Sequence, residues 1–343
     1  MKISDFDYQL PDVLIAQEPL SARQASRMMV VDRVSSKIED RMFTDLPDLL
    51  TPGDVLVVNN TKVFPARLLG KSETGANVEI FLVRELEDQV WESLAKPTRR
   101  LPPGKRILFD RDLSAEVIER VPDGKLVIRF AATGRFEDVL ERIGKTPLPP
   151  YIKRSDGTLE EDRTRYQTVY AKERGSIAAP TAGLHFTDDV IAGIRARGIE
   201  IIEITLHVGY GTFEPVRVDD LAEHRVSPEN YEIDDRSANL LGQAVAERRR
   251  IVAVGTTTTR ALESCVANSG RFVAGRGTAD LTITPGYEFK AVNSLLTNFH
   301  LPKSSLLILV STFAGRELIM KAYEHAVAER YRFYSYGDCM FII

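Results

Sequence analysis

The sequence predicts an α/β fold, in which a mixed-sheet α/β domain carries an inserted, small antiparallel β-barrel domain. Three observations predict it. Residues 1–60 and 151–343 contain strand-like runs together with helical patterns, which is typical of an α/β sheet. Residues 61–150 instead contain mainly short strand candidates separated by turns. The length of 343 residues is sufficient for two domains. We therefore expect one domain from 1–60 and 151–343, and a barrel domain from 61–150.

The first 60 residues contain one short helix signal and three strand signals. Residues 10–17 (Leu-Pro-Asp-Val-Leu-Ile-Ala-Gln) predict a short helix, because proline favours the first turn. Residues 28–32 and 38–43 predict two strands joined by the polar segment 35–37. The continuous apolar run within 53–60 predicts a buried strand.

The central segment predicts the barrel. Its strand candidates are evenly spaced and separated by Gly- and Pro-containing turns, at 66–70, 78–83, 90–95, 106–109, 115–120 and 126–130. This spacing favours a small antiparallel barrel of the Greek-key type. A helical pattern at 135–143 and the proline-rich stretch 146–150 end the segment.

The remainder returns to strands and helices. Thr187 is a helix N-cap for a helix that runs to about Arg197, and Gly198 ends it. The further elements expected are a strand at 199–208, a helix at 234–249, a buried strand at 251–254 followed by a helix, an apolar helix from 304–305 onward and an amphipathic helix at 317–330.

Composition excludes several classes of protein. The chain has 45 basic and 49 acidic residues, so its net charge is −4 and it does not hold nucleic acid by bulk charge, although a local basic face stays possible. Two cysteines provide neither a disulfide framework nor a four-ligand zinc site. The N-terminus lacks the apolar core of a signal peptide, and the run 306–310 is too short to span a bilayer. We expect a cytoplasmic protein that is not bound to a membrane.

Four of the five histidines lie in short loops rich in Gly, Thr and Pro: His185, His207, His224 and His300. Imidazole has the side-chain pKa nearest neutrality, and loops commonly present such groups to a substrate. We therefore expect an enzyme in which these four histidines are candidate catalytic residues. The alternative is that each histidine is a buried hydrogen-bonding residue that holds its loop together. Their spacing matches no metal-ligand pattern, and we expect no metal site.

Several candidate binding residues follow strand-like runs, where ligands bind in α/β sheets. A threonine run after Gly255 offers amide and hydroxyl donors at a helix start, although capping alone could explain it. The sequence contains no P-loop, Rossmann glycine fingerprint or nucleophile elbow in these loops. The candidate substrate-binding residues are Asn59, Asn60, Thr61, Arg67, Thr181, Gly183, Gly209, Tyr210, Gly211, Phe213, Thr256, Thr257, Arg260, Glu263 and Asn298.

Six strings taken together are more specific than any one of them. They are Asn-Asn-Thr-Lys-Val-Phe-Pro-Ala-Arg-Leu (59–68), Ala-Pro-Thr-Ala-Gly-Leu-His-Phe (179–186), His-Val-Gly-Tyr-Gly-Thr-Phe (207–213), Gly-Thr-Thr-Thr-Thr-Arg (255–260), Thr-Asn-Phe-His-Leu-Pro (297–302) and Tyr-Gly-Asp-Cys-Met-Phe-Ile (336–342). In this order and spacing, the chain closely resembles the S-adenosylmethionine:tRNA ribosyltransferase-isomerase family of bacterial queuosine biosynthesis, from its first residues to its last.

The resemblance implies a reaction. The substrate would be tRNA with a GUN-type anticodon that carries 7-aminomethyl-7-deazaguanine at the wobble position. The enzyme would transfer the ribosyl part of S-adenosylmethionine to the aminomethyl group and rearrange it, giving epoxyqueuosine and releasing adenine and methionine. S-adenosylmethionine would then be a consumed cosubstrate, with no recycled cofactor. The family fold, an α/β catalytic domain with an inserted β-barrel, agrees with the boundaries above, and we expect a monomer.

The implied chemistry suggests roles for the candidates. The sulfonium acidifies the hydrogens on the ribosyl 5′ carbon, so a base can remove one, while adenine needs a proton or hydrogen bond to depart. We assign this work first to His185 and His207, with His224, His300 and Asp338 in support. Tyr210 or Phe213 could place an aromatic face against the sulfonium, and Arg260 could hold the methionine carboxylate.

Two other functions stay open at this point. An S-adenosylmethionine-dependent RNA methyltransferase shares the cosubstrate, although the missing glycine fingerprint counts against it. A non-catalytic RNA-binding module built around the barrel is the second alternative, although the acidic net charge and the loop histidines count against it.

Overall fold

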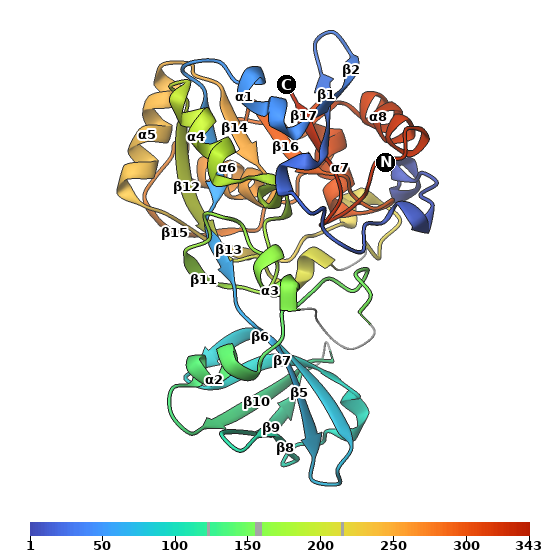
Figure 1. Ribbon diagram of the computed structural model, residues 1–343, viewed down its shortest axis with the longest axis vertical. Coiled ribbons are helices and arrows are strands. Elements are labelled where there is room, and N and C mark those ends of the chain that lie inside the picture. Colours follow the sequence, from blue (N-terminus) through green and yellow to red (C-terminus); the bar gives the residue numbers. More distant parts are fainter. Residues whose placement is uncertain (122–123, 155–159, 214–215) are drawn as a thin grey trace.

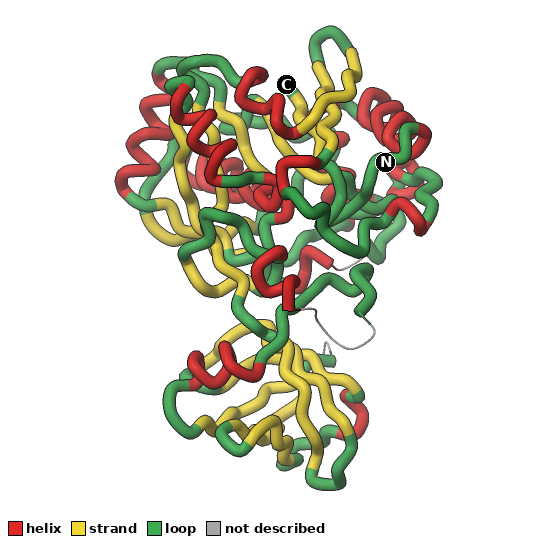
Figure 2. Tube along the Cα trace, viewed as in Figure 1, coloured by secondary structure: helices red, strands yellow, loops and turns green. Residues whose placement is uncertain are grey.

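The computed structural model describes residues 1–121, 124–154, 160–213 and 216–343. The larger part of the molecule contains a nine-stranded sheet with helices around it, and the smaller part is a barrel (Figure 1). Figure 2 shows mainly strands, with a short helix beside them, in the smaller part, whereas helices surround the large sheet. The predicted α/β fold with an inserted antiparallel barrel is confirmed.

The large sheet is mixed. Its order is β15-β13-β12-β3-β14-β16-β17-β1-β2. The central pairs β12–β3, β3–β14 and β14–β16 are parallel, and so is β17–β1, while the remaining pairs are antiparallel. In chain order, the strands are β1 (Arg27–Asp32), β2 (Lys37–Met42), β3 (Val55–Asn59), β12 (Glu200–Leu206), β13 (Glu229–Ile233), β14 (Ile251–Val254), β15 (Gly275–Ala279), β16 (Ser294–Asn298) and β17 (Cys339–Ile342).

Helices cover both faces of this sheet, because alternate residues of its central strands point to opposite sides. Val57 and Leu295 belong to one core cluster, together with residues of α5 (Asp235–Ala246), α6 (Thr256–Ser269), α7 (Ser305–Ala314) and α8 (Arg316–Ala328). Leu56 and Leu296, their neighbours in sequence, belong to a second cluster with residues of α1 (Leu46–Leu49) and α4 (Asp188–Ala196). The central strands are therefore buried on both sides.

The six strands expected between 61 and 150 close into a barrel in the order β10-β7-β6-β5-β8-β9, with every neighbouring pair antiparallel. Alternating apolar residues such as Leu68, Ile80 and Val117 fill its interior, and α2 (Phe136–Ile143) adds Phe136 and Leu140 to the same core. The strands are β5 (Arg67–Ser72), β6 (Asn77–Glu87), β7 (Val90–Lys96), β8 (Arg106–Asp110), β9 (Leu113–Arg120) and β10 (Leu126–Ala132).

The two connections to the barrel run side by side. β4 (Thr61–Val63) leads toward the barrel, and β11 (Glu173–Ser176) lies on the return path after α3 (Glu160–Arg165). The two strands pair in parallel, with Thr61 opposite Glu173. This pair, which we call the connecting ribbon, was not expected from the sequence.

One expected helix is wrong. Residues 10–17 contain only a single 3-10 turn, Asp12–Leu14. Leu14 is buried in the main core, and Ile15 forms an isolated bridge with Phe333, so tertiary contacts hold this segment in an extended conformation. Thr187 does cap its helix, accepting from the Val190 amide. The other expected helices and strands are found with ends shifted by a few residues.

Both cysteines are free and buried, Cys265 in the cluster around α6 and Cys339 on β17. Burial raises the pKa of the Cys339 thiol well above its ordinary value. None of the described helices combines the length and apolar content that crossing a bilayer requires.

Candidate functional site

Two large cavities lie beside the loop that follows β12. The first, which we call the interface cavity, has a volume of about 700 Å³ and is lined by both the barrel and the larger part of the molecule. The second, the helix cavity, has a volume of about 560 Å³ and includes the start of α6 in its lining. Val208 lines both cavities, so the two are separated by a shared wall. These volumes are in the range of sites for small ligands.

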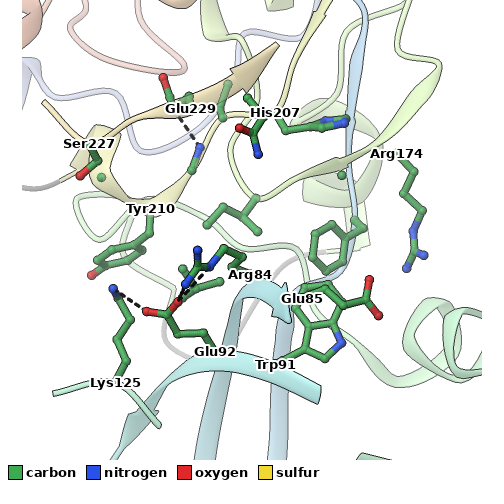
Figure 3. A pocket seen from close by; sticks show the side chains of 18 of the residues that line it. Arg84, Glu85, Trp91, Glu92, Lys125, Arg174, His207, Tyr210, Ser227 and Glu229 are labelled. Carbon is green, nitrogen blue, oxygen red and sulfur yellow. Dashed lines mark hydrogen bonds and ion pairs between the residues drawn. The ribbon is translucent and has the colours of Figure 1, made fainter. Parts of the chain in front are cut away.

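The interface cavity brings barrel residues opposite the loop at 207–211 (Figure 3). Trp91 and Glu92 come from β7, and Glu92 pairs with both Arg84 and Lys125 at 2.9 Å. Across the cavity lie His207 and Tyr210. The Tyr210 ring packs edge-on against the Phe81 ring, with 5.6 Å between the ring centroids. The cavity therefore offers aromatic faces together with charges that are partly neutralised by one another.

His207 is the candidate catalytic residue of the interface cavity. Its Nδ1 lies 2.8 Å from the Thr61 hydroxyl on the connecting ribbon. Burial is the main cause that lowers the pKa of this imidazole, and Arg276 adds to the shift, while Glu173 and Glu232 oppose it. The ring is therefore neutral at physiological pH.

The helix cavity contains an uncapped helix N-terminus. No side chain caps the first amides of α6, which follows Gly255 in a positive-φ conformation of 94°. Thr258 and Thr259 turn their hydroxyls back to the carbonyls of Val254 and Gly255, at 2.7 and 3.1 Å. Thr256 and Thr257 instead line the cavity. The free amides at this end favour a carboxylate or phosphate.

Asn298 and His300 extend the polar lining of the helix cavity. Asn298 is 2% exposed, and its amide nitrogen donates to the Tyr334 carbonyl at 2.9 Å, whereas its Oδ1 has no hydrogen-bond partner in the described structure. His300 Nε2 lies 3.0 Å from the Thr297 hydroxyl, and burial lowers its pKa to about 3. Thr181 lines the same cavity. The unpartnered Oδ1 is an acceptor that a ligand amine can satisfy.

The other two loop histidines line two smaller cavities. His185 Nδ1 lies 2.8 Å from the Ser26 hydroxyl. Burial lowers the pKa of His185 to about 4, and the nearby Asn298 side chain opposes this shift. His185 Nε2 and Asn298 Oδ1 nevertheless have no hydrogen-bond partner of good geometry in the described structure. His224 Nε2 lies 3.0 Å from the Ser305 hydroxyl, and burial also lowers its pKa. The structure thus places the four loop histidines around adjoining cavities and does not gather them in one.

The family is decided by comparison with known proteins. The family model described as "Queuosine biosynthesis protein" matches residues 3–342. The chain belongs to this family. Relatives named S-adenosylmethionine:tRNA ribosyltransferase-isomerase are 51% identical in Syntrophotalea carbinolica and 52% identical in Symbiobacterium thermophilum, each over 100% of both chains. A crystal structure of S-adenosylmethionine tRNA ribosyltransferase from Thermotoga maritima is 37% identical, with a TM-score of 0.58, covering 99% of this chain and 100% of the other.

In this member of the queuosine biosynthesis family, Asp338 and Arg260 make buried contacts with protein groups. Asp338 accepts from the amides of Arg27 and Arg332 at 2.9 and 2.8 Å, and burial raises its pKa. The Arg260 guanidinium donates to Glu229 at 2.7 Å and to the carbonyls of Ser227 and Ala279. Arg260 therefore holds Ser227 and Glu229, which line the interface cavity, against the end of β15.

Glu263, which is fully buried, holds the segment that precedes β16. Its carboxylate accepts from the Tyr287 hydroxyl at 2.8 Å and from the amides of Lys290, Ala291 and Val292 at 2.9 to 3.0 Å. It is not among the residues that line the two large cavities. The buried carboxylate has its hydrogen-bonding capacity satisfied by this segment.

The remaining predicted residues of this family member differ in whether they line a cavity or contact other protein groups. Gly209, Tyr210 and Gly211 line the interface cavity. Buried or paired side chains at the base of the ribbon and barrel make contacts within the protein: Asn59 with the Leu206 backbone, Asn60 with Glu203 and Thr205, and Arg67 with Glu79. Gly183 packs so closely that a Cβ would lie 2.1 Å from the Tyr170 hydroxyl. The side chain of Phe213 lies outside the described residues.

Sequence reasoning missed Glu229, Trp91 and Gly175. Glu229 accepts from the Gly209 amide at 2.9 Å and so fixes the loop that lines the interface cavity. Trp91 reaches this cavity from the barrel, and Gly175 reaches it from the connecting ribbon. Trp91 is the single tryptophan of the chain, which was a usable signal. Glu229 and Gly175 have no such signal, because their roles depend on contacts distant in sequence.

Acid should destabilise the folded protein through His300 and His185. Their pKa values in the folded state are about 3 and about 4, below the ordinary 6.5. As the pH falls below 6.5, these histidines become protonated in the unfolded chain but stay neutral in the folded protein. The free energy of unfolding therefore falls by about 1.4 kcal/mol per pH unit and per histidine, until the pH reaches the pKa of the folded state. Urea unfolding at pH 7, 5.5 and 4.5 measures this slope.

The variant His300→Gln isolates one contribution to that slope. It should flatten the slope between pH 6.5 and 4.5 relative to the wild type, because the pKa of His300 is lowered by burial in the folded state. Equal slopes for wild type and His300→Gln would contradict the expected role of His300.

Proposed function

We propose that this chain is an S-adenosylmethionine:tRNA ribosyltransferase-isomerase. It transfers the ribosyl part of S-adenosylmethionine to 7-aminomethyl-7-deazaguanine at the wobble position of tRNA and isomerises it, giving epoxyqueuosine-tRNA, adenine and methionine. S-adenosylmethionine is consumed as a cosubstrate, and no recycled cofactor takes part. The observation that carries the proposal is the pair of large cavities with a shared wall at Val208, as a reaction between two bound substrates requires.

S-adenosylmethionine is assigned to the helix cavity. The uncapped amides at the start of α6 suit its carboxylate, and Thr256 and Thr257 lie beside them. The buried Oδ1 of Asn298 accepts from its ammonium or adenine amine. Tyr151 and Tyr334, whose ring centroids are 3.9 Å apart, add aromatic surface for the adenine or sulfonium. The Arg260 guanidinium already donates to Glu229, so the α6 amides are the better partners for the carboxylate of S-adenosylmethionine.

The wobble base is assigned to the interface cavity. An anticodon loop presents unstacked bases, which proteins bind by stacking on aromatic rings. Tyr210 supplies such a ring, Arg84 and Lys125 supply cationic groups on the same side of the cavity, and Arg174 supplies one on the opposite side. The proposed domains are the α/β catalytic domain, 1–60 and 151–343, and the barrel domain, 61–150, so the RNA contacts both. The tRNA is of the GUN-anticodon type.

Proton transfer is assigned first to His207, because it lies in the interface cavity next to the wall residue Val208. His300 lines the helix cavity. His185 lines a smaller cavity that shares Ser335 with the helix cavity, and His224 lines one that shares Gly211 with the interface cavity. Asp338 holds the backbone at Arg332. These four support the reaction. We assign the enzyme to the cytoplasm, because free buried cysteines are compatible with its reducing conditions. We also propose that it is a monomer, since one chain forms both cavities.

The test incubates the purified protein with S-adenosylmethionine and tRNA carrying 7-aminomethyl-7-deazaguanine, and follows all products by mass spectrometry. Adenine and methionine in equal amounts, together with epoxyqueuosine in the tRNA, are expected. S-adenosylhomocysteine with a methylated base would replace the proposal by a methyltransferase. Tight tRNA binding without turnover would replace it by an RNA-binding module.

A further inference from the structure

The connecting ribbon holds the imidazole of His207 from two sides. Thr61 lies on β4 and contacts its Nδ1, while Gly175 lies on β11 and contacts the face of its ring. We propose that Thr61 and Gly175 are positioning residues that hold His207 in the tautomer protonated at Nδ1, so that Nε2 is free to accept a proton in the interface cavity. This inference rests on the proposed function, and it deepens the role of His207 in it.

The hydrogen bonds of Thr61 select the tautomer. Its hydroxyl lies 2.8 Å from His207 Nδ1 and 3.4 Å from the Glu173 carbonyl oxygen. A carbonyl oxygen only accepts, so the hydroxyl proton points to Glu173, and the hydroxyl oxygen accepts from Nδ1–H. Because a neutral imidazole carries one N–H, Nε2 then has a free lone pair. No hydrogen bond engages Nε2 within the described structure, so this lone pair is available to a substrate.

The absence of a side chain at Gly175 leaves room for the His207 ring. A Cβ on residue 175 would lie 2.7 Å from Cε1 of His207 and 2.8 Å from both ring nitrogens. Real Cβ contacts are longer, and the neighbouring backbone of the ribbon is fixed by its pairing with β4. Only glycine therefore lets the imidazole lie flat against the ribbon while keeping its bond to Thr61.

The surroundings keep the imidazole neutral before the reaction. Burial and Arg276 disfavour the imidazolium, whereas Glu173 and Glu232 favour it, and the balance lowers the pKa of His207. In turnover, a proton leaves the reacting substrate for Nε2, and its bonding electron pair stays on the substrate. The resulting imidazolium keeps Nδ1–H on Thr61, so the ring does not turn when its charge changes.

The tautomer can be measured without any turnover. Long-range ¹H–¹⁵N correlation spectra of the full-length protein labelled with ¹⁵N-histidine at pH 7.5 report the protonation of each ring nitrogen, and comparison with His207→Gln identifies the signal among the five histidines. A protonated Nδ1 and an unprotonated Nε2 are expected. In Thr61→Val, this pattern should shift toward Nε2–H or toward a mixture. A wild-type signal with Nε2–H would overturn the inference.

Kinetics test the consequence. The variant Thr61→Val keeps the shape of the side chain but lacks the hydroxyl. It should lower kcat about 10- to 100-fold, which is part of the total contribution of a general base. KM should be unchanged, and the pH profile of kcat should shift. Thr61→Ser should restore most of kcat, and Gly175→Ala should lower it although the fold is retained, as judged by circular dichroism. The matched control is Thr312→Val, whose hydroxyl donates to the Ile308 carbonyl within its own helix.

The two proposals fail in different ways. If the wild type releases adenine but Thr61→Val keeps the wild-type kcat and pH profile, the positioning role is wrong while the proposed function stands. If the wild type releases no adenine although the spectra show the Nδ1–H tautomer, the proposed function fails, and the tautomer assignment survives without its catalytic role.

Discussion

Replacing His207 by glutamine is expected to lower kcat for adenine release about 10²- to 10⁴-fold, the range that a positioned general base contributes. Glutamine has a similar reach and can still contact the Thr61 hydroxyl, 2.8 Å from Nδ1 in the wild type, but it cannot accept a proton near neutral pH. Affinity for S-adenosylmethionine should change little, because His207 lines the interface cavity and not the helix cavity. Single-turnover adenine release and equilibrium binding measure the two effects separately.

His325→Gln is the matched control for that substitution. His325 lies on α8, where its ring pairs with Asp40 at 3.1 Å on the surface, so its replacement should leave kcat within about twofold of the wild type. Near-normal turnover of His207→Gln would remove His207 from the proton transfer and leave His300 and His185 as the leading candidates.

Replacing Arg260 by methionine should destabilise the fold by about 3–5 kcal/mol, the usual result of removing one partner of a buried ion pair. The side chains of Arg260 and Glu229 are only 8% and 4% exposed, and the substitution removes this buried ion pair. The carbonyls of Ser227 and Ala279 also lose their donor. Chemical denaturation in urea measures the change in the free energy of unfolding.

The outcome separates two roles for Arg260. Arg276→Met is the control, because Arg276 forms an exposed ion pair with Glu232 on the neighbouring strand and should cost less than about 1 kcal/mol. If Arg260→Met instead kept its stability and raised KM for S-adenosylmethionine, Arg260 would hold the methionine carboxylate, as the sequence suggests. The structure favours the structural role.

Local patterns were sufficient for most of the fold. The barrel strands alternate apolar and polar residues, and Thr187 caps α4, so these elements are visible in short windows of sequence. Six of the described strands were not predicted, because their stability depends on distant partners: β4, β11, β13, β15, β16 and β17. β15, with the sequence Gly-Arg-Gly-Thr-Ala, has almost no apolar pattern and exists through its pairing with β13. β17 lies between β16 and β1, far from both in sequence.

The site was predictable as a set of loops and not as a geometry. Residue types identified His207, Tyr210, Thr256 and Asn298, which line the two large cavities. They could not distinguish a carboxylate that faces a ligand from one that holds the backbone, as Glu263 does. That distinction depends on which amides surround the side chain after folding.

The two buried cysteines make this protein a convenient subject for distance measurements by fluorescence. Thiol-directed dyes react with exposed thiolates, and Cys265 and Cys339 are 1% and 0% exposed. Cysteines introduced at Val34, which is 96% exposed, and at Arg111, whose side chain is 87% exposed, would be labelled selectively in the otherwise unaltered chain. Because Val34 follows β1 and Arg111 lies between β8 and β9, energy transfer between the dyes would follow the separation of barrel and sheet through a catalytic cycle.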